Sequence, residues 1–239
     1  MEELEFKENR SYFIPDVDGV LFEKYRDCAL EAGLEIKHMD LIDPSKSCAY
    51  NPVTYVSGYD EAEMLARCIV GDSKTKALLA SLIALTAVYV PEEKRNLEFV
   101  AGLLSEPESG FMEELISAVE SVDANDPLVA AFYTVKKNAG KRFPKVCGIC
   151  LKRLRFLLDS PAGALFKEDE AELDALIMRP IAFFVTIPGN DDSLHFVAEA
   201  AYRQAYVAAY KYCLDSRTMP ISISFFSEEF KALLPGLDM

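Results

Sequence analysis

The chain of 239 residues is 51% hydrophobic and 27% charged, an ordinary globular composition that excludes disordered, collagen-like and disulfide-scaffold classes. Its 39 acidic and 25 basic residues give a net charge of −14, so nonspecific binding to nucleic acid or to an anionic membrane is not expected. The longest apolar stretch, residues 77–90, is shorter than the roughly 20 residues that cross a bilayer, and no membrane span is expected.

The first predicted elements are a strand, a turn and a helix over residues 11–33. The turn contains Asp18 and Gly19, and Gly33 suits the helix end because glycine adopts the left-handed conformation of a C-cap. A second apolar strand over residues 34–42 ends at Asp43-Pro44. This order of elements predicts the beginning of an α/β fold.

Residues 60–178 change to a helical period of apolar side chains. The pattern predicts about seven helices and no strand, with prolines near the segment boundaries. We therefore expect an inserted all-α domain over residues 60–178.

The sheet is predicted to resume after the insertion. Residues 181–188 form a continuous apolar run, which is typical of a strand buried on both faces of a parallel sheet. A long helix with Ser193 as its N-cap and a last strand over residues 221–226 follow. The predicted fold class is α/β, with residues 1–59 and 179–239 forming the sheet domain.

The candidate ligand site consists of acidic residues at the ends of predicted strands. Open α/β sheets bind ligands at the carboxyl edge of their strands, where Asp16, Asp18, Asp191 and Asp192 are expected. Two acidic turns that converge there could hold Mg²⁺ or position a catalytic water. Turn formation and helix capping explain the same residues without a ligand, and we favour that interpretation.

The other chemistry-bearing residues have simpler explanations. Cys147 and Cys150 form a CxxC spacing, but the other cysteines offer no second pair, so apolar packing is favoured over a redox or zinc site. His38 and His195 are the only histidines, which argues against a metal site built on histidine clusters.

A local excess of positive charge lies within the predicted helical domain. Its members could form a face for DNA or an acidic partner, but helical periodicity spreads them over more than one face, so an ordinary solvated surface is favoured. Tyr202, Tyr206 and Tyr210 recur every four residues and are expected to pack in the core. The basic residues are Lys136, Lys137, Lys141, Arg142, Lys145, Lys152, Arg153 and Arg155.

Several local patterns resemble the TraG-type coupling ATPases of type IV secretion, which feed relaxase-bound DNA or effectors into the conjugation channel. The most specific pattern is Asp40-Leu41-Ile42-Asp43-Pro44-Ser45-Lys46-Ser47 followed by Tyr50-Asn51-Pro52, similar to the Asn-Leu-x-Asp-Pro-x-Lys-Ser and Tyr-Asn-Pro of the family. Further matches are the turn from Pro15 to Leu21, the Phe-rich strand that ends at Pro188, Gln204 in the following helix, and the run from Phe225 to Phe230.

The resemblance implies a partial RecA-like sheet that carries an all-α domain for recognition of relaxosome or effector proteins. The family's phosphate loop is missing, because no glycine begins a G-x-x-x-x-G-K-[ST] pattern. Glu228 and Glu229 resemble an altered Walker B pair, and a solvated strand end explains the same two residues equally well. Autonomous ATP hydrolysis is therefore not expected, and no cofactor is predicted.

Three functional hypotheses follow. The first is a non-hydrolytic module that recognises a protein substrate or accessory factor of conjugative transfer, for which the negative charge favours a basic protein partner over bare DNA. The second is a Mg-ATP-binding subunit whose site is completed in trans by a partner that supplies a phosphate loop, with Asp16, Asp18, Asp191, Glu228 and Glu229 as remnants of the nucleotide edge. The third is a structural or immunity-type scaffold of a mobile element.

Location and association are also predicted. The acidic amino terminus has no apolar segment of a signal peptide, and six cysteines without a disulfide pattern are typical of reduced thiols. We expect a cytoplasmic protein. The resemblance implies that it is recruited to the inner face of the membrane. An exposed sheet edge would favour self-association.

Overall fold

The computed structural model describes residues 4–71, 73–105, 107, 110–216 and 218–225. The chain divides into two compact units. Met1–Tyr50 and Asp169–Met239 form the first, here called the sheet unit, and Asn51–Glu168 form the second, here called the helical unit.

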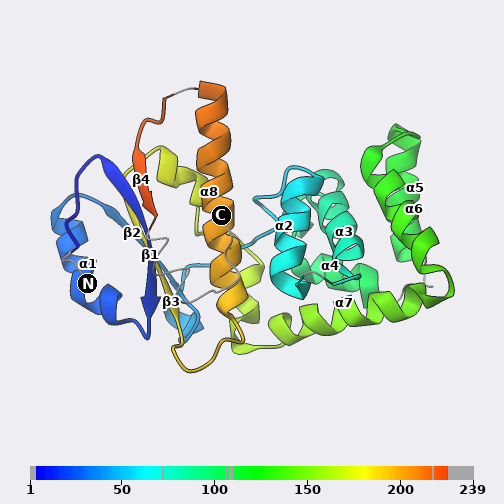
Figure 1. Cartoon of the computed structure of the whole chain (residues 1–239), viewed down its shortest axis with the longest axis horizontal. Helices are drawn as coiled ribbons and strands as arrows, with labels where there is room; N and C mark the ends of the chain where they lie inside the picture. The colour runs from blue at the N-terminus through cyan, green and yellow to red at the C-terminus, as the bar shows by residue number, and fades with distance from the viewer. Residues whose placement is uncertain (1–3, 72, 106, 108–109, 217, 226–239) are drawn as a thin grey trace. The chain divides into compact units, whose positions relative to one another are not determined.

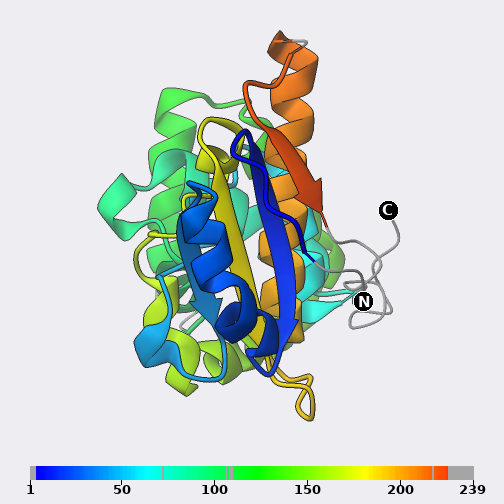
Figure 2. The same cartoon turned by 90° about the vertical axis from the view of Figure 1, so that its left-hand side faces the viewer.

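The sheet unit is built on four parallel strands in the order β2-β3-β1-β4 (Figure 2). Strand β3, Ile181–Ile187, is fully buried, as its unbroken apolar run requires in the middle of a parallel sheet. The predicted α/β fold class is confirmed. The other strands are β1 (Arg10–Val17), β2 (Glu35–Asp40) and β4 (Ser222–Phe225).

Two helices cover the two faces of this sheet (Figure 2). Helix α1, Val20–Glu31, packs Tyr25 and Ala29 against Tyr12 and Ile14 of β1. Helix α8, His195–Ser216, covers the opposite face, where Tyr202 packs edge-on against Phe13. The opposite placement follows from the chain path, because right-handed crossovers in opposite directions put their helices on opposite faces.

The two units differ from the predicted domain boundaries at both ends of the insertion. Residues 51–59, predicted in the sheet domain, belong to the helical unit, and residues 169–178, predicted in the all-α domain, belong to the sheet unit. The helical pattern of apolar residues continues into the second segment, which forms only a short 3-10 helix, η5 (Leu173–Ile177). It is tied to the strands because the backbone N–H of Ile221 donates to the carbonyl of Ile177. A second 3-10 helix, η1 (Pro44–Lys46), follows β2.

The helical unit contains six α-helices in its described residues and no strand. Helix α3 (Lys76–Tyr89) is buried on all sides from Leu78 to Ala87, which explains its nearly continuous apolar sequence. Helix α7 (Phe143–Leu158) runs along one side of α2, α3 and α4 (Figure 1). The others are α2 (Tyr59–Val70), α4 (Leu97–Ser105), α5 (Phe111–Val122) and α6 (Pro127–Ala139), joined by η2 (Glu92–Lys94), η3 (Gly140–Arg142) and η4 (Pro161–Phe166).

Over the part of the chain that the structure describes, no helix combines the length and the apolar character needed to cross a membrane. Helix α3, which is buried on all sides, is only 14 residues long.

Candidate functional site

The point where a doubly wound sheet binds ligands lies between β1 and β3. These neighbouring strands lead to helices on opposite faces, which opens a crevice at their carboxyl ends in this type of fold. Asp16 and Thr186 are paired in register at this edge, and Asp40 of β2 pairs with Thr186 from the other side. The switch point is here defined as these three residues with Asp18 and Gly189.

Asp16 is fully buried and occupies the amino terminus of α1. Its Oδ1 accepts a hydrogen bond of 2.8 Å from the backbone N–H of Leu21, and its Oδ2 accepts one of 2.8 Å from Phe22. Free N–H groups at a helix start are where an α/β protein would hold a phosphate. Two of them are occupied by the chain's own carboxylate.

Burial raises the pKa of Asp16 above its ordinary value. The two backbone hydrogen bonds oppose this shift, and the nearby carboxylate of Asp40 adds to it. The Thr186 hydroxyl lies 3.5 Å from Asp16 Oδ2 and donates toward it. Asp16 is therefore a polar group of the core, held by its partners.

Asp18 links the turns that follow β1 and β3. Its Oδ1 accepts a hydrogen bond of 2.8 Å from the backbone N–H of Gly189, and its own N–H donates to the Ile187 carbonyl at 2.9 Å. Asp18 has a φ of 58°, in the left-handed region, which aspartate tolerates better than most side chains. A Cβ at position 189 would lie 2.8 Å from Val17 Cγ1, so a larger residue here would require a neighbouring side chain to shift.

The other predicted site residues do not join this cluster. Asp191 is exposed and folds back on its own turn, where Oδ1 accepts a hydrogen bond of 2.9 Å from the Ser193 N–H. This bond lowers the pKa of Asp191 below its ordinary value. Glu228 and Glu229 lie outside the described residues.

Three polar residues of the switch point region were missed as site residues in the sequence analysis. His38 Nε2 lies 2.8 Å from Thr186 Oγ1, and its ring stacks on Phe22 with ring centroids 3.7 Å apart. Burial lowers the pKa of His38, partly opposed by the charge of Asp40. Asp40 Oδ1 accepts the backbone N–H groups of Ile42 and Asp43. The sequence does contain a signal for these residues, because each of the apolar strands β2 and β3 has polar residues near its carboxyl end.

The carboxylates at this edge of the sheet are hydrogen-bonded to groups of the chain itself. Each carboxylate of the switch point accepts hydrogen bonds from the backbone of its own turn or of the neighbouring one. In the residues that the structure describes, no three His, Cys, Asp or Glu side chains gather as a group able to hold a metal ion. The geometry favours the interpretation of capping and turn formation for Asp16, Asp18 and Asp191.

The CxxC cysteines are buried in the core of the helical unit. Cys147 and Cys150 lie on the inner side of α7, and burial raises their pKa values to about 11 and about 12. Cys150 Sγ lies 3.6 Å from the Thr75 carbonyl oxygen. A thiol that stays protonated is a poor nucleophile and a poor metal ligand, so these residues serve packing.

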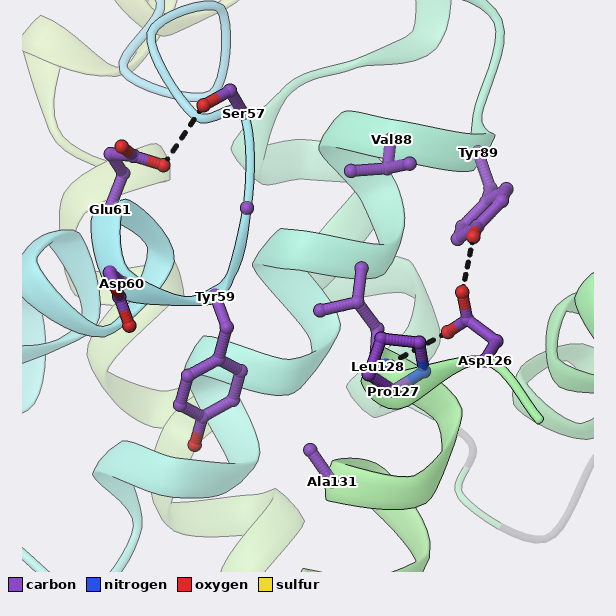
Figure 3. A pocket seen from close by; sticks show the side chains of 11 residues that line it. Ser57, Tyr59, Asp60, Glu61, Val88, Tyr89, Asp126, Pro127, Leu128 and Ala131 are labelled. Carbon is purple, nitrogen blue, oxygen red and sulfur yellow. Dashed lines mark hydrogen bonds between the residues drawn. The ribbon is translucent and has the colours of Figure 1, made fainter. Parts of the chain in front are cut away.

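The helical unit contains a pocket of about 470 Å³ with an acidic lining (Figure 3). Asp126 caps α6, because its Oδ1 accepts the N–H groups of Leu128 and Val129, and its Oδ2 accepts the Tyr89 hydroxyl. Ser57 donates to Glu61 on the opposite wall. These polar groups bind one another, and their negative charge disfavours phosphate ligands.

Three of the residues that carry the resemblance, Tyr50, Asn51 and Gln204, are buried. Within the sheet unit, the Tyr50 hydroxyl donates to Gln204 Oε1 at 2.6 Å. This hydrogen bond joins two positions of the resemblance that lie far apart in the sequence. Within the helical unit, Asn51 Nδ2 donates to the Arg95 carbonyl at 2.6 Å and its Oδ1 accepts the Val53 N–H. Asp43 caps η1 through the Ser45 N–H. Each of these motif residues thus anchors the chain within its own unit.

The fold and this site define an α/β protein with a parallel sheet, a helical insertion between β2 and β3, and a switch point filled by its own side chains. No family model matches the chain, and no curated protein matches it. Among solved structures it is similar to the bacterial conjugative coupling protein TrwBdeltaN70 in its unbound monoclinic form, with 11% identity and a TM-score of 0.44. The similarity covers 85% of this chain and 52% of that protein, so the chain spans about half its length.

Proposed function

We propose that the chain is a protein-recognition module of conjugative type IV secretion that does not hydrolyse ATP by itself. Its substrate would be a relaxosome component, another transferred protein or an accessory factor of DNA transfer. The proposal rests on the sequence resemblance to TraG-type coupling proteins, and the observation that carries it is the Tyr50–Gln204 hydrogen bond between two positions of the resemblance.

The switch point supports the non-hydrolytic part of the proposal. Phosphoryl transfer needs backbone N–H groups around the β and γ phosphates together with a lysine and Mg²⁺ ligands. At the start of α1, the N–H groups of Leu21 and Phe22 are bound by Asp16, and the turn carries further negative charge at Asp18. A phosphate would have to displace a buried carboxylate from this position.

Protein recognition is assigned to the helical unit. Its core is independent of the strands, with α3 buried among its own helices. Its charge also differs from that of the rest of the chain, because residues 51–168 contain 14 basic and 16 acidic residues, a net charge of −2 out of −14. Most of the negative charge lies in the sheet unit. The overall charge of the helical unit therefore does not select for basic partners.

The direct test uses the full chain immobilised on a biosensor surface and titrated with purified relaxases, their accessory proteins and secreted effectors of conjugative systems. The proposal predicts saturable binding to at least one of them without nucleotide. The control is a DNA-binding protein that is unrelated to conjugation and has an isoelectric point similar to that of the relaxases. It should not bind.

Two outcomes would replace the proposal. Binding that appears only with Mg-ATP and a phosphate-loop-bearing partner would favour the subunit completed in trans. Absence of binding to every conjugation protein would favour a structural scaffold.

A further inference from the structure

The outward side of α7 carries basic and apolar side chains along one line. Lys145, Ile149, Lys152 and Phe156 follow one another at intervals of four, three and four residues, which places them on one side of the helix. The buried residues of α7, from Phe143 to Leu157, lie on the other side. The α7 outer stripe is here defined as Arg142, Lys145, Ile149, Lys152, Arg153 and Phe156.

The charge of this stripe is locally unbalanced. Residues 136–158 contain eight basic and no acidic side chains, whereas residues 96–135 contain eight acidic and no basic ones. Two of the basic residues pair across the unit, Lys136 with Glu113 and Arg155 with Glu98. Within the described part of the chain, the four cations of the stripe have no ion-pair partner, and all four are exposed.

Two large apolar side chains lie among these cations. Ile149 is 46% exposed and Phe156 is 52% exposed. They are seven residues apart, about 10.5 Å along the helix axis, or two turns. A single exposed apolar residue is ordinary, but two of them in register with four unpaired cations form a pattern that one ligand can match.

We propose that the α7 outer stripe binds an acidic amphipathic helix of a partner protein, an inference that rests on the proposed function and specifies the chemistry of the partner. Two apolar residues of that helix, seven positions apart, contact Ile149 and Phe156. Its Asp and Glu side chains, on both sides of these residues, pair with Arg142, Lys145, Lys152 and Arg153. The stripe is about 21 Å long, the length of a helix of about 14 residues.

This occupant fits better than other anions. Nucleic acid presents phosphates without apolar groups at a two-turn spacing, so it would leave the exposed Ile149 and Phe156 without apolar partners. A short acidic helix satisfies both the cations and the apolar pair, as in other helix-on-helix recognition.

The test measures binding of a designed, fluorescein-labelled peptide to the full chain by anisotropy. The peptide is a helix of about 16 residues with leucines on one face and glutamates beside them. The control peptide has the same composition with the leucines redistributed around the helix. We expect saturable binding of the first peptide and binding weaker by about tenfold or more for the second.

The protein variants separate charge from apolar contact. Lys145→Glu/Lys152→Glu and Ile149→Ala/Phe156→Ala should each weaken binding by about tenfold. The matched control, Lys94→Glu/Lys167→Glu, makes the same charge change at exposed lysines elsewhere on the helical unit and should leave binding within about twofold. Thermal melts of each variant report its folding.

The inference is overturned if both peptides bind equally, if the control variant loses as much affinity as the stripe variants, or if no binding is seen. Stronger binding of a DNA duplex or of phosphatidylserine vesicles through the same residues would also overturn it. Self-association that is lost in the Lys145→Glu/Lys152→Glu variant would reassign the stripe to a second copy of this chain. Peptide binding without binding to any conjugation protein would remove the proposed function while leaving the stripe as an acidic-helix site.

Discussion

Replacement of Asp16 tests whether the carboxylate at the switch point is a structural cap. Asp16→Ala removes the acceptors of two 2.8 Å hydrogen bonds and leaves the N–H groups of Leu21 and Phe22 without them at a partly buried helix start. Loss of an N-cap costs about 0.5–2 kcal/mol, and unsatisfied buried donors cost about 1–3 kcal/mol. We expect the free energy of unfolding to fall by about 2–4 kcal/mol, and by less in Asp16→Asn, which keeps one oxygen acceptor.

The assay is urea unfolding followed by circular dichroism, with Asp191→Ala as the control for loss of an exposed turn carboxylate. The control should unfold close to the wild type. An Asp16→Ala variant as stable as the wild type would refute the reasoning, because it would mean that the two hydrogen bonds do not support the fold.

The pH dependence gives an independent check of the same residue. Burial raises the pKa of Asp16, so the folded protein holds the Asp16 proton at a pH where the unfolded chain has released it. The contribution of Asp16 to stability is therefore full below its ordinary pKa of about 3.9 and decreases as pH rises through the folded value. The stability difference between wild type and Asp16→Asn should shrink over this window, and a difference that grows would contradict the assignment.

Three further predictions concern His38, glycine and cysteine. Burial lowers the pKa of His38, so stability should fall as pH decreases from about 6.5 toward the folded value, and His38→Gln should remove this slope in melts at several pH values. In Gly163→Ala the new Cβ would lie 1.9 Å from the Leu158 carbonyl oxygen, so urea unfolding should show a loss of about 3 kcal/mol or more, whereas Gly148→Ala, with open space in α7, should not be destabilised. Iodoacetamide at pH 8 should modify the exposed Cys28 and Cys213 in the native protein, and mass spectrometry should find Cys147 and Cys150 modified only after denaturation.

Much of the fold could be predicted because strand and helix periods differ clearly in this sequence. The unbroken apolar run at residues 181–187 predicted the central strand β3, and it is buried throughout. The prediction over residues 169–178 was wrong in type. These residues have a helical pattern, but the backbone forms short i to i+3 bonds between Glu172 and Met178, because the segment packs against the strands.

The candidate site was harder to predict because partners come from separate strands. The sequence shows that Asp16 and Asp18 follow a strand, but not that Asp18 meets Gly189, since that depends on which strand lies next to β1. The tyrosine stripe of α8 illustrates the same limit. Tyr202 is buried as predicted, whereas Tyr206 and Tyr210 are 47% and 57% exposed. Tyr206 packs edge-on against Phe225 of β4, but helical periodicity alone does not show how much of α8 such a short strand covers.

The central claim is that the switch point is closed by the chain's own carboxylates, so that partners and not nucleotide are bound. Calorimetric titration of the full chain with Mg-ATP tests it most directly, with Asp16→Asn titrated in parallel. We expect no saturable heat at millimolar nucleotide for either protein. Saturable, Mg²⁺-dependent binding by the wild type that is lost in Asp16→Asn would contradict it and would make Asp16 a ligand of the nucleotide site.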